Sequence, residues 1–396
     1  MGKGGKYLAK KPKRRQNPAM MLLKGAFTLA VAVVCCVVSV NILTKLAQSG
    51  GKTGSAVAGG GVELTLMDRF DMRMNNQVSS ALDGVLDIKK VYWLSDDDMV
   101  APKPNPANFG KTKDPASLAW IIEQTKNMMD GQELRFASVT NIPRGSEINY
   151  YVDETILAIT WKQIMDGSHY TVCEVKINHP SQLRRFLAGG EYGSEIQLQT
   201  TQMAASVNAV LASAGDFYGY RREGVIVYDG IVRRTDVSRV ETCYIDDKGD
   251  MHLSYIGQLG TMEEAQRFVD ENNIRFSLSF GPVLVDKGEK IPVDAGYYVG
   301  QPADPYPRAA LCQLGELHYL VVTVNKEPDN GTYGTQSIYT FQKNIQTFDP
   351  YMAYCIDGGQ TATVVMNGEV LNTLATGSQR YISDIFYFAT ALPEEE

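Results

Sequence analysis

A short run near the C-terminus carries the residue types that line polar pockets. An apolar segment ends at a carboxylate, and the residues from there on are Asp357, Gly358, Gly359, Gln360, Thr361 and, after one alanine, Thr363. Glycine has no Cβ, so the backbone can turn sharply there and another group can approach closely. The pattern predicts a polar pocket wall at the end of a strand. The alternative is a tight β-turn whose aspartate caps its own backbone.

A second glycine-flanked stretch, AGDFYG at residues 214–219, follows an apolar segment. Asp216 and Tyr218 together suit a sugar site, because aromatic rings stack on sugar faces and carboxylates bind hydroxyls. The alternative is a glycine that ends a helix, followed by an exposed aspartate.

Four more charged residues stand in or beside apolar segments. Arg308 opens a strand and could grip a phosphate through two parallel hydrogen bonds, although a surface position is the alternative. Arg380 and Asp384 lie four residues apart before the last strand, and they could instead pair with each other. Glu174 interrupts an apolar strand, where it could also point to solvent.

The charge distribution excludes a nucleic-acid partner. Residues 1–62 hold ten Lys or Arg and no acid, which leaves 28 basic and 45 acidic residues in the remainder, a net charge of −17. An acidic body lacks the basic face that nucleic acids require. The histidines and cysteines show no metal-ligand spacing, and no nucleotide-binding loop occurs, so we expect neither a metal nor a cofactor.

The N-terminal third predicts a membrane anchor and a stalk. A basic head (1–24) precedes a segment (25–45) whose apolar core is long enough to span a bilayer as a helix, and the basic excess favours a cytoplasmic N-terminus. A cleaved signal peptide is the rival interpretation. Residues 46–61 are Gly/Ser/Ala-rich and predict a flexible linker. In residues 62–147 apolar residues recur every four positions at first, which predicts a helical stalk or accessory region.

From residue 148 to 396 the sequence predicts an α+β domain, with a mixed, mostly antiparallel sheet and flanking helices. Asp229-Gly230 between two β-branched runs predicts a hairpin, and a second hairpin is expected over 243–256. Other strands are expected at 156–161, 170–177, 276–285, 311–324 and 353–371. Helices are expected at 118–129, 200–213, 262–272 and 337–346.

The ordered blocks AGDFYG, SFGPVLVDKGE, PRAALCQLG, IDGGQTATVVMNGEVLN and RYISDIFYF resemble the phosphodiester glycosidase family. That family includes the mammalian uncovering enzyme and bacterial envelope proteins labelled exopolysaccharide-related. The resemblance covers residues 150–388 and implies hydrolysis of the glycosidic bond of a sugar-1-phosphodiester. Two positions depart from the family pattern: Ala214 stands where the family has Asn, and Gln360 stands where it has a third glycine.

The resemblance also implies roles for individual residues. The implied catalytic residues are Asp357, Asp216 and Arg308, and Glu174 is a further catalytic candidate that could act as a proton shuttle. The implied substrate-binding residues are Tyr218, Gly358, Gly359, Gln360, Thr361, Thr363, Arg380 and Asp384. In this interpretation the chain is a single-pass membrane protein of a bacterial cell envelope, with an extracellular hydrolase domain that acts on carbohydrate phosphodiesters.

Two alternatives remain from the sequence. The chain could be a catalytically silent glycan-binding or envelope-assembly protein that keeps the pocket, which Ala214 favours. It could also be a scaffold that binds partners through residues 62–140. The sequence does not predict an oligomeric state.

Overall fold

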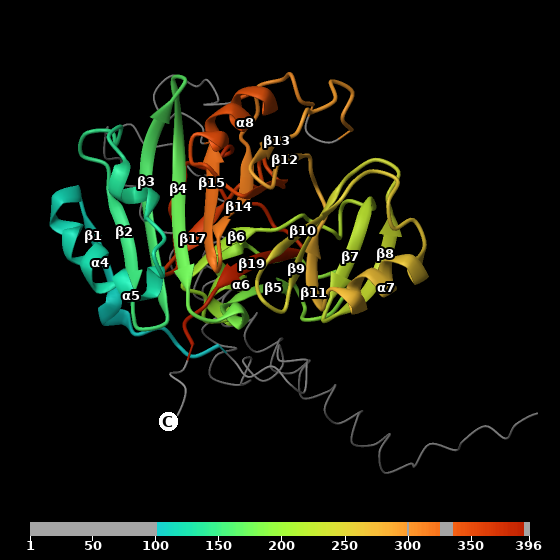
Figure 1. The fold of residues 1–396 in the computed structure, drawn as a ribbon, viewed down its shortest axis with the longest axis horizontal. Coiled ribbons are helices and arrows are strands. Elements are labelled where there is room, and N and C mark those ends of the chain that lie inside the picture. The colour runs from blue at the N-terminus through green and yellow to red at the C-terminus, as the bar shows by residue number, and fades with distance from the viewer. Residues whose placement is uncertain (1–100, 299–300, 325–335, 392–396) are drawn as a thin grey trace, which may run out of the picture. The chain divides into compact units, whose positions relative to one another are not determined.

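The computed structural model describes residues 101–298, 301–324 and 336–391. They lie in one unit of the chain, Asn76–Glu396, and form three β-sheets with a few short helices (Figure 1). The predicted head (1–24), membrane segment (25–45) and linker (46–61) lie outside the described residues, as does the stalk up to residue 100. None of the helices in the described residues combines the length and the apolar character needed to cross a membrane.

The largest sheet has nine strands in the order β1-β2-β3-β4-β15-β14-β16-β12-β13. Its strands are β1 (Phe109–Thr112), β2 (Ile148–Val152), β3 (Ile156–Met165), β4 (Ser168–Ile177), β12 (Val283–Asp286), β13 (Glu289–Lys290), β14 (Ala309–Gly315), β15 (His318–Val324) and β16 (Met352–Ile356). Each neighbouring pair is antiparallel. Strand β1 extends this sheet from the region where the sequence predicts a stalk.

Two smaller sheets have five strands each, with the orders β10-β9-β11-β7-β8 and β18-β17-β6-β19-β5, and their pairs are also antiparallel. The first contains β7 (Gly224–Tyr228), β8 (Ile231–Asp236), β9 (Thr242–Asp246), β10 (Met251–Ser254) and β11 (Ile274–Leu278). The second contains β5 (Leu183–Leu187), β6 (Leu211–Ala214), β17 (Val364–Met366), β18 (Glu369–Val370) and β19 (Asp384–Phe388). The two predicted hairpins are confirmed as β7-β8 and β9-β10.

The helices are short and lie between strands. They are α4 (Ala119–Gln124), α5 (Lys126–Met129), α6 (Thr200–Ser206), α7 (Met262–Glu271) and α8 (Ile338–Gln346), with 3-10 turns at Pro106–Asn108, Pro115–Leu118, Arg135–Ser138 and Pro180–Gln182. Helix α7 begins with a capping box, in which Thr261 accepts from the Glu264 backbone and the Glu264 carboxylate accepts from the Thr261 backbone. The predicted helices at 262–272 and 337–346 are therefore confirmed, as is the largely antiparallel α+β architecture.

Three predicted elements differ from the structure. The helix expected over 200–213 ends at Ser206, and Leu211–Ala214 forms β6, the strand between β17 and β19. Tertiary pairing of this fully buried segment overrides its helical propensity. The segment expected to be extended over 276–285 forms the two strands β11 and β12, and between them lies Pro282, which has no N–H to donate to a neighbouring strand. The helix expected over 118–129 is divided at Thr125 into α4 and α5.

Both faces of the nine-stranded sheet are buried. Leu157, Ile159 and Trp161 on β3 pack in one apolar cluster with residues of α4, α5 and α8. The alternate residues Ile156 and Ala158 pack in a second cluster with residues of both five-stranded sheets. This alternation follows from strand geometry, in which successive side chains point to opposite faces. Tyr354 and Ile356 at the end of β16 belong to the second cluster, so this end lies where the large sheet faces the smaller ones.

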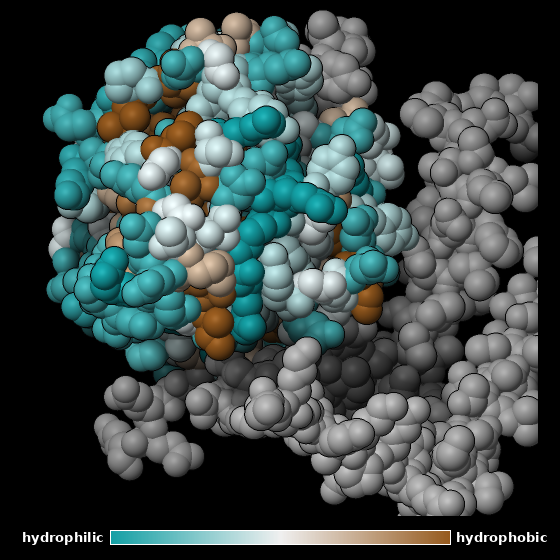
Figure 2. Space-filling view, turned by 90° about the vertical axis from the view of Figure 1, so that its right-hand side faces the viewer, coloured by the Kyte–Doolittle hydropathy of each residue, from teal (hydrophilic) through white to brown (hydrophobic). Residues whose placement is uncertain are grey.

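The exposed surface is mixed in character. Figure 2 shows apolar side chains in small groups separated by hydrophilic ones. Exposed large apolar residues such as Ile231, Ile256 and Met262 are scattered over different elements. Scattered apolar residues of this kind are normal on a protein surface and do not mark a binding site.

Candidate functional site

The segment that follows β16 docks against two other turns. The Asp357 N–H donates to the Gly215 carbonyl (3.2 Å), and the Gly359 N–H donates to the Pro307 carbonyl (2.8 Å). A Cβ at Gly358 would lie 2.6 Å from that same Pro307 oxygen, so only glycine fits there without a shift. Gly359 has a positive φ of 61°. The two glycines thus let this turn contact the start of β14, where the sequence analysis expected a ligand to approach.

Asp357 lies in the wall of a cavity of about 350 Å³, which we call the Asp357 cavity. The other residues that line it are Arg221, Phe280, Tyr298, Gln301, Tyr306, Arg308, Ala309, Ile338, Cys355, Ile356, Gly358 and Gly359. Aromatic rings, two arginines and one carboxylate therefore share this space. Asp357 is the only acidic residue among the described residues that line it.

The Asp357 carboxylate is buried beside two cations. Only 6% of the residue is exposed, and its Oδ1 lies 3.8 Å from Nη2 of Arg221. Burial raises the pKa of Asp357 to about 6, while Arg221, a hydrogen bond from Thr361 and the charge of Arg380 oppose that rise. At neutral pH the carboxylate is ionised. The separation from Arg221 exceeds hydrogen-bond length, so both groups can still bind substrate atoms.

Arg221 was not singled out from the sequence. Its guanidinium carbon lies 4.5 Å from the centre of the Phe280 ring, and a quarter of its side chain is exposed. Arg380, which was predicted, is exposed and stacks on Phe217 and Tyr220, with guanidinium-to-ring distances of 5.0 and 5.4 Å. The signal for Arg221 was its place directly after the aromatic run at 217–220.

Arg308 lines the Asp357 cavity, as the sequence analysis expected of a site residue. Its guanidinium donates to the backbone carbonyls of Gln336 (3.1 Å), Gln301 (3.1 Å) and Asp304 (2.7 Å). Burial lowers the pKa of Arg308. These bonds hold the loop before β14 and engage the Arg308 guanidinium with backbone carbonyls. Arg221, whose side chain is a quarter exposed, is therefore better placed to bind a phosphate.

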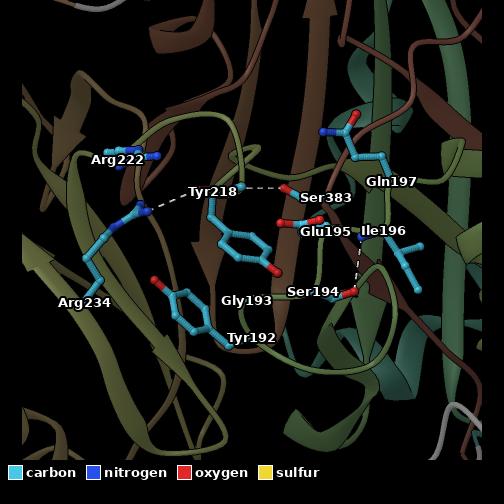
Figure 3. A pocket seen from close by; sticks show the side chains of 11 residues that line it. Tyr192, Gly193, Ser194, Glu195, Ile196, Gln197, Tyr218, Arg222, Arg234 and Ser383 are labelled. Atoms are coloured by element: carbon cyan, nitrogen blue, oxygen red, sulfur yellow. Dashed lines mark hydrogen bonds between the residues drawn. The ribbon is translucent and has the colours of Figure 1, made fainter.

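Tyr218 faces a different space, the Tyr218 cavity, of about 440 Å³ (Figure 3). Its other lining residues are Tyr192, Gly193, Ser194, Glu195, Ile196, Gln197, Gly219, Arg222, Arg234 and Ser383. Consecutive residues Arg221 and Arg222 line the two cavities, so the turn at 217–222 forms a wall of each. The structure therefore does not bring Tyr218 and Asp357 into one cavity.

Asp216 and Asp384 line neither cavity. Both side chains are fully buried, and one guanidinium nitrogen of Arg185 lies 2.6 Å from Asp216 and 3.0 Å from Asp384. Asp216 also accepts from the backbone of Tyr218 and Ser279. Burial raises the pKa of Asp216 and Arg185 lowers it. Asp216, for which the resemblance implies a catalytic role, and Asp384, for which it implies substrate binding, are thus both buried in an ion-pair cluster in this structure.

Asp384 instead holds the turn that separates the cavities. Its Oδ2 accepts from the Asp216 N–H (3.2 Å), and its Oδ1 accepts from the Phe217 N–H (2.9 Å). Arg185 also donates to the Ser277 carbonyl. The Arg185–Asp216–Asp384 cluster thus fixes residues 216–218 through hydrogen bonds to their backbone N–H groups. The sequence alternative in which Arg380 pairs with Asp384 is not what the structure shows, because Asp384 pairs with Arg185.

Glu174 also lines neither cavity. Its carboxylate accepts from the backbone of Arg135 (2.6 Å) and Phe136 (2.8 Å) and lies 2.9 Å from Nε2 of His318, and it is fully buried. These bonds fix the segment before β2 against β4. The carboxylate that the sequence analysis named as a catalytic candidate is therefore engaged by backbone N–H groups and a histidine in this structure.

The remaining predicted residues mostly support the turn. The Thr361 hydroxyl donates to the Gly358 carbonyl (2.6 Å), and the buried Thr363 accepts from the Ala214 N–H through its carbonyl (3.0 Å). Gln360 is exposed and lines neither cavity. Ala214 packs in an apolar cluster, so the position where the family has Asn faces the core here. Among the described residues no group of three or more His, Cys, Asp or Glu could hold a metal.

We predict that Arg185→Met lowers the free energy of unfolding by about 3–5 kcal/mol, because it leaves two buried carboxylates without their cation. Chemical denaturation of the full-length chain measures this change. The neighbouring Arg184→Met is the matched control, since Arg184 is partly exposed and bonds a backbone carbonyl, and we expect a loss below about 1 kcal/mol. Equal losses for the two variants would contradict a special role for Arg185.

We predict that Gly358→Ala costs about 1–3 kcal/mol of stability, because the added methyl must displace the Pro307 carbonyl. The matched control is Gly260→Ala, where the added Cβ would meet only Val237 at an ordinary 3.6 Å. Thermal or chemical unfolding compares the two. A Gly358 variant as stable as the control would mean that the docking against Pro307 is loose.

Comparison with known proteins gives the following similarities. The chain shares 13% identity with a hypothetical protein from Synechocystis, with a TM-score of 0.46. This match covers 61% of the present chain and 64% of the Synechocystis chain. It shares 17% identity with the catalytic domain of zebrafish N-acetylglucosamine-1-phosphodiester alpha-N-acetylglucosaminidase, auto-inhibited by its pro-peptide, with a TM-score of 0.47 and coverage of 74% and 99%. No curated protein matches the sequence.

A family model also matches part of the sequence. The match extends from residue 207 to residue 389, which includes Asp216, Arg308, Asp357 and Asp384. This range agrees with the blocks on which the resemblance was based. The family model is described as phosphodiester glycosidase, so the resemblance of residues 207–389 to that family is confirmed.

Proposed function

We propose that this chain hydrolyses the glycosidic C–O bond of a sugar-1-phosphodiester in the Asp357 cavity. The observation that carries the proposal is the buried Asp357 carboxylate, 3.8 Å from the Arg221 guanidinium, in the wall of that cavity. A carboxylate stabilises or attacks an anomeric carbon that becomes oxocarbenium-like. A guanidinium beside it binds the phosphate that leaves.

The leaving group explains why one carboxylate in the cavity wall is sufficient. An ordinary glycosidase uses a second carboxylic acid to protonate the departing oxygen. A phosphate monoester departs as a stable anion, so it requires charge stabilisation more than a proton. Arg221, with the charge of Arg380 nearby, supplies this stabilisation in a partly dry site.

Asp357 can act by two routes. In one route it attacks the anomeric carbon, forms a glycosyl ester as the phosphate leaves, and water then hydrolyses that ester. In the other route it takes a proton from a water molecule, which attacks the anomeric carbon directly. Both break the same C–O bond and release a free sugar and a phosphate monoester, but they give opposite anomers.

The cellular setting is also part of the proposal. The basic head at 1–24 and the apolar segment at 25–45 support a single-pass anchor with the domain outside the cell. The substrates would then be phosphodiester-linked sugars of a bacterial cell envelope or exopolysaccharide. The acidic body of residues 63–396, whose net charge is −17, also suits a small phosphodiester group held by specific arginines better than a long polyanion.

The alternative function is a silent protein that binds such glycans or helps to assemble the envelope. From the sequence, Ala214 in place of the family Asn favours it. In the structure Ala214 lies in an apolar cluster and lines neither cavity, so its methyl removes no polar group from the Asp357 cavity. This position favours the enzyme over the silent protein.

We predict that the full-length chain releases aryl phosphate from an aryl diester of a sugar-1-phosphate, and that Asp357→Asn lowers kcat by about 10²–10⁴-fold. In ¹⁸O-labelled water the label should enter the sugar, because the C–O bond breaks. Label in the phosphate would indicate P–O cleavage and would overturn the proposal. Glycan binding by both proteins with no release of product by either would establish the silent alternative.

The same variant separates chemistry from folding. The pKa of Asp357 is raised in the folded chain, so its contribution to stability is present below the unfolded pKa and is lost as the pH rises through about 6. Removing the charge at pH 7 therefore should not destabilise the chain. An inactive Asp357→Asn protein with wild-type or higher stability fits a catalytic role.

We predict that kcat/KM rises with pH through an apparent pKa near 6, because Asp357 must be ionised to act. The Arg221 cation lowers the pKa of Asp357, so Arg221→Gln should raise that pKa. The rise in kcat/KM should then move to higher pH, and kcat should fall. Arg221→Lys, which keeps a charge, should move the profile less. A pH profile that is identical in Arg221→Gln and the wild type would mean that Asp357 is not the group whose ionisation controls catalysis.

A further inference from the structure

The Tyr218 cavity lies on the other side of the turn from the Asp357 cavity. Tyr218, Gly219 and Arg222 of that turn line the Tyr218 cavity, while Arg221 lines the Asp357 cavity. The turn is fixed beneath by the bonds from Asp384 and, on the side of the Tyr218 cavity, by Arg234, which donates to the Tyr218 and Arg221 carbonyls (3.1 and 2.9 Å). The two spaces are therefore held in a fixed relation.

An aromatic pair forms one wall of the Tyr218 cavity. The rings of Tyr192 and Tyr218 are nearly parallel, with centroids 5.3 Å apart and an interplanar angle of 26°. Arg185 packs over Tyr218, with a distance of 5.6 Å from its guanidinium carbon to the ring centre. Tyr192 is only partly buried, so it offers ring surface to a ligand.

Polar groups of several kinds surround this pair. Figure 3 shows Arg222 and Arg234 on one side of Tyr218, and Glu195 and Gln197 on the other. A carboxylate accepts hydrogen bonds from hydroxyl groups, a guanidinium donates to them, and an amide does both. The side chains of Glu195, Gln197 and Arg222 are exposed and can make such bonds. This set of groups suits a ligand that presents many hydroxyls around an apolar ring face.

The hydroxyl hydrogen of Tyr218 has no acceptor within the described part of the chain. The residue is 3% exposed and lines the cavity, and the only group directed at its oxygen is a donor, the Gly193 backbone N–H. Burial raises the pKa of Tyr218 to about 12, so the group stays protonated and can donate. A buried donor without a partner is unfavourable, and Figure 3 shows that it points toward the loop at 193–195, where a ligand oxygen or a bridging water would satisfy it.

We infer that the Tyr218 cavity is a second binding site, which holds a saccharide unit of a glycan chain. The choice of a saccharide over other hydroxyl-rich ligands rests on the proposed function, while the cavity and its aromatic wall do not. A sugar ring stacked on Tyr192 would bond Glu195 and Gln197 through its hydroxyls. The enzyme would thereby bind a polymer through two cavities, one of which contains no catalytic group.

The test measures binding without turnover. Full-length Asp357→Asn protein is titrated calorimetrically with tetra-N-acetylchitotetraose, maltotetraose and tetragalacturonate, which cover acetylated, neutral and anionic chains. We expect one of them to bind and Tyr192→Ala, in the same background, to weaken its affinity by about tenfold through loss of the stacking surface. Tyr351→Ala is the matched control, since Tyr351 is half exposed and lines neither cavity, and it should leave the affinity unchanged.

The outcomes separate this inference from the proposed function. Failure of all three saccharides to bind, or equal affinity of Tyr192→Ala and its parent, overturns the second site. Binding that depends on Arg221 and not on Tyr192 would place the sugar in the Asp357 cavity alone, which also overturns it. Loss of the hydrolytic activity would be seen only in the separate assay with the aryl diester, so either proposal can fail without the other.

Discussion

The site depends on one cation held between two buried carboxylates. Asp216 and Asp384 lie too deep for solvent to screen them, and without Arg185 between them they would repel each other. With Arg185 in place, the four carboxylate oxygens also accept the backbone N–H groups of residues 216–218 and of Ser279. Three buried charges that line neither cavity therefore determine the path of the turn that both cavities share.

From this cluster the constraint reaches the reacting carboxylate through the backbone. Gly215 precedes the clustered Asp216, and its carbonyl accepts the Asp357 N–H, while Pro307 accepts the Gly359 N–H. Asp357 comes from the end of the nine-stranded sheet, and the turn at 215–221 joins the two smaller sheets. The candidate active site thus exists only where these sheets pack together.

The sequence predicted what local pattern controls. The Asp229-Gly230 hairpin, helix α7 with its capping box, and the glycine turn after Asp357 are all encoded within a few residues. It did not predict which acids face substrate, because the partner of Asp216 and Asp384 is Arg185, 31 and 199 residues away. Buried and cavity-facing carboxylates look alike in a sequence, and Arg221 gave only the signal of following an aromatic run.

The partition between the two cavities is only one turn thick, and its neighbouring arginines point to opposite sides. If residues 217–222 were shortened in a related chain, the Asp357 cavity and the Tyr218 cavity would merge into one groove. Arg221 and Arg222 would then no longer serve separate cavities. If the turn were lengthened, it would narrow both cavities. The length of this one segment, rather than the identity of Asp357, is therefore what most simply sets the size of the ligands that the two cavities can admit.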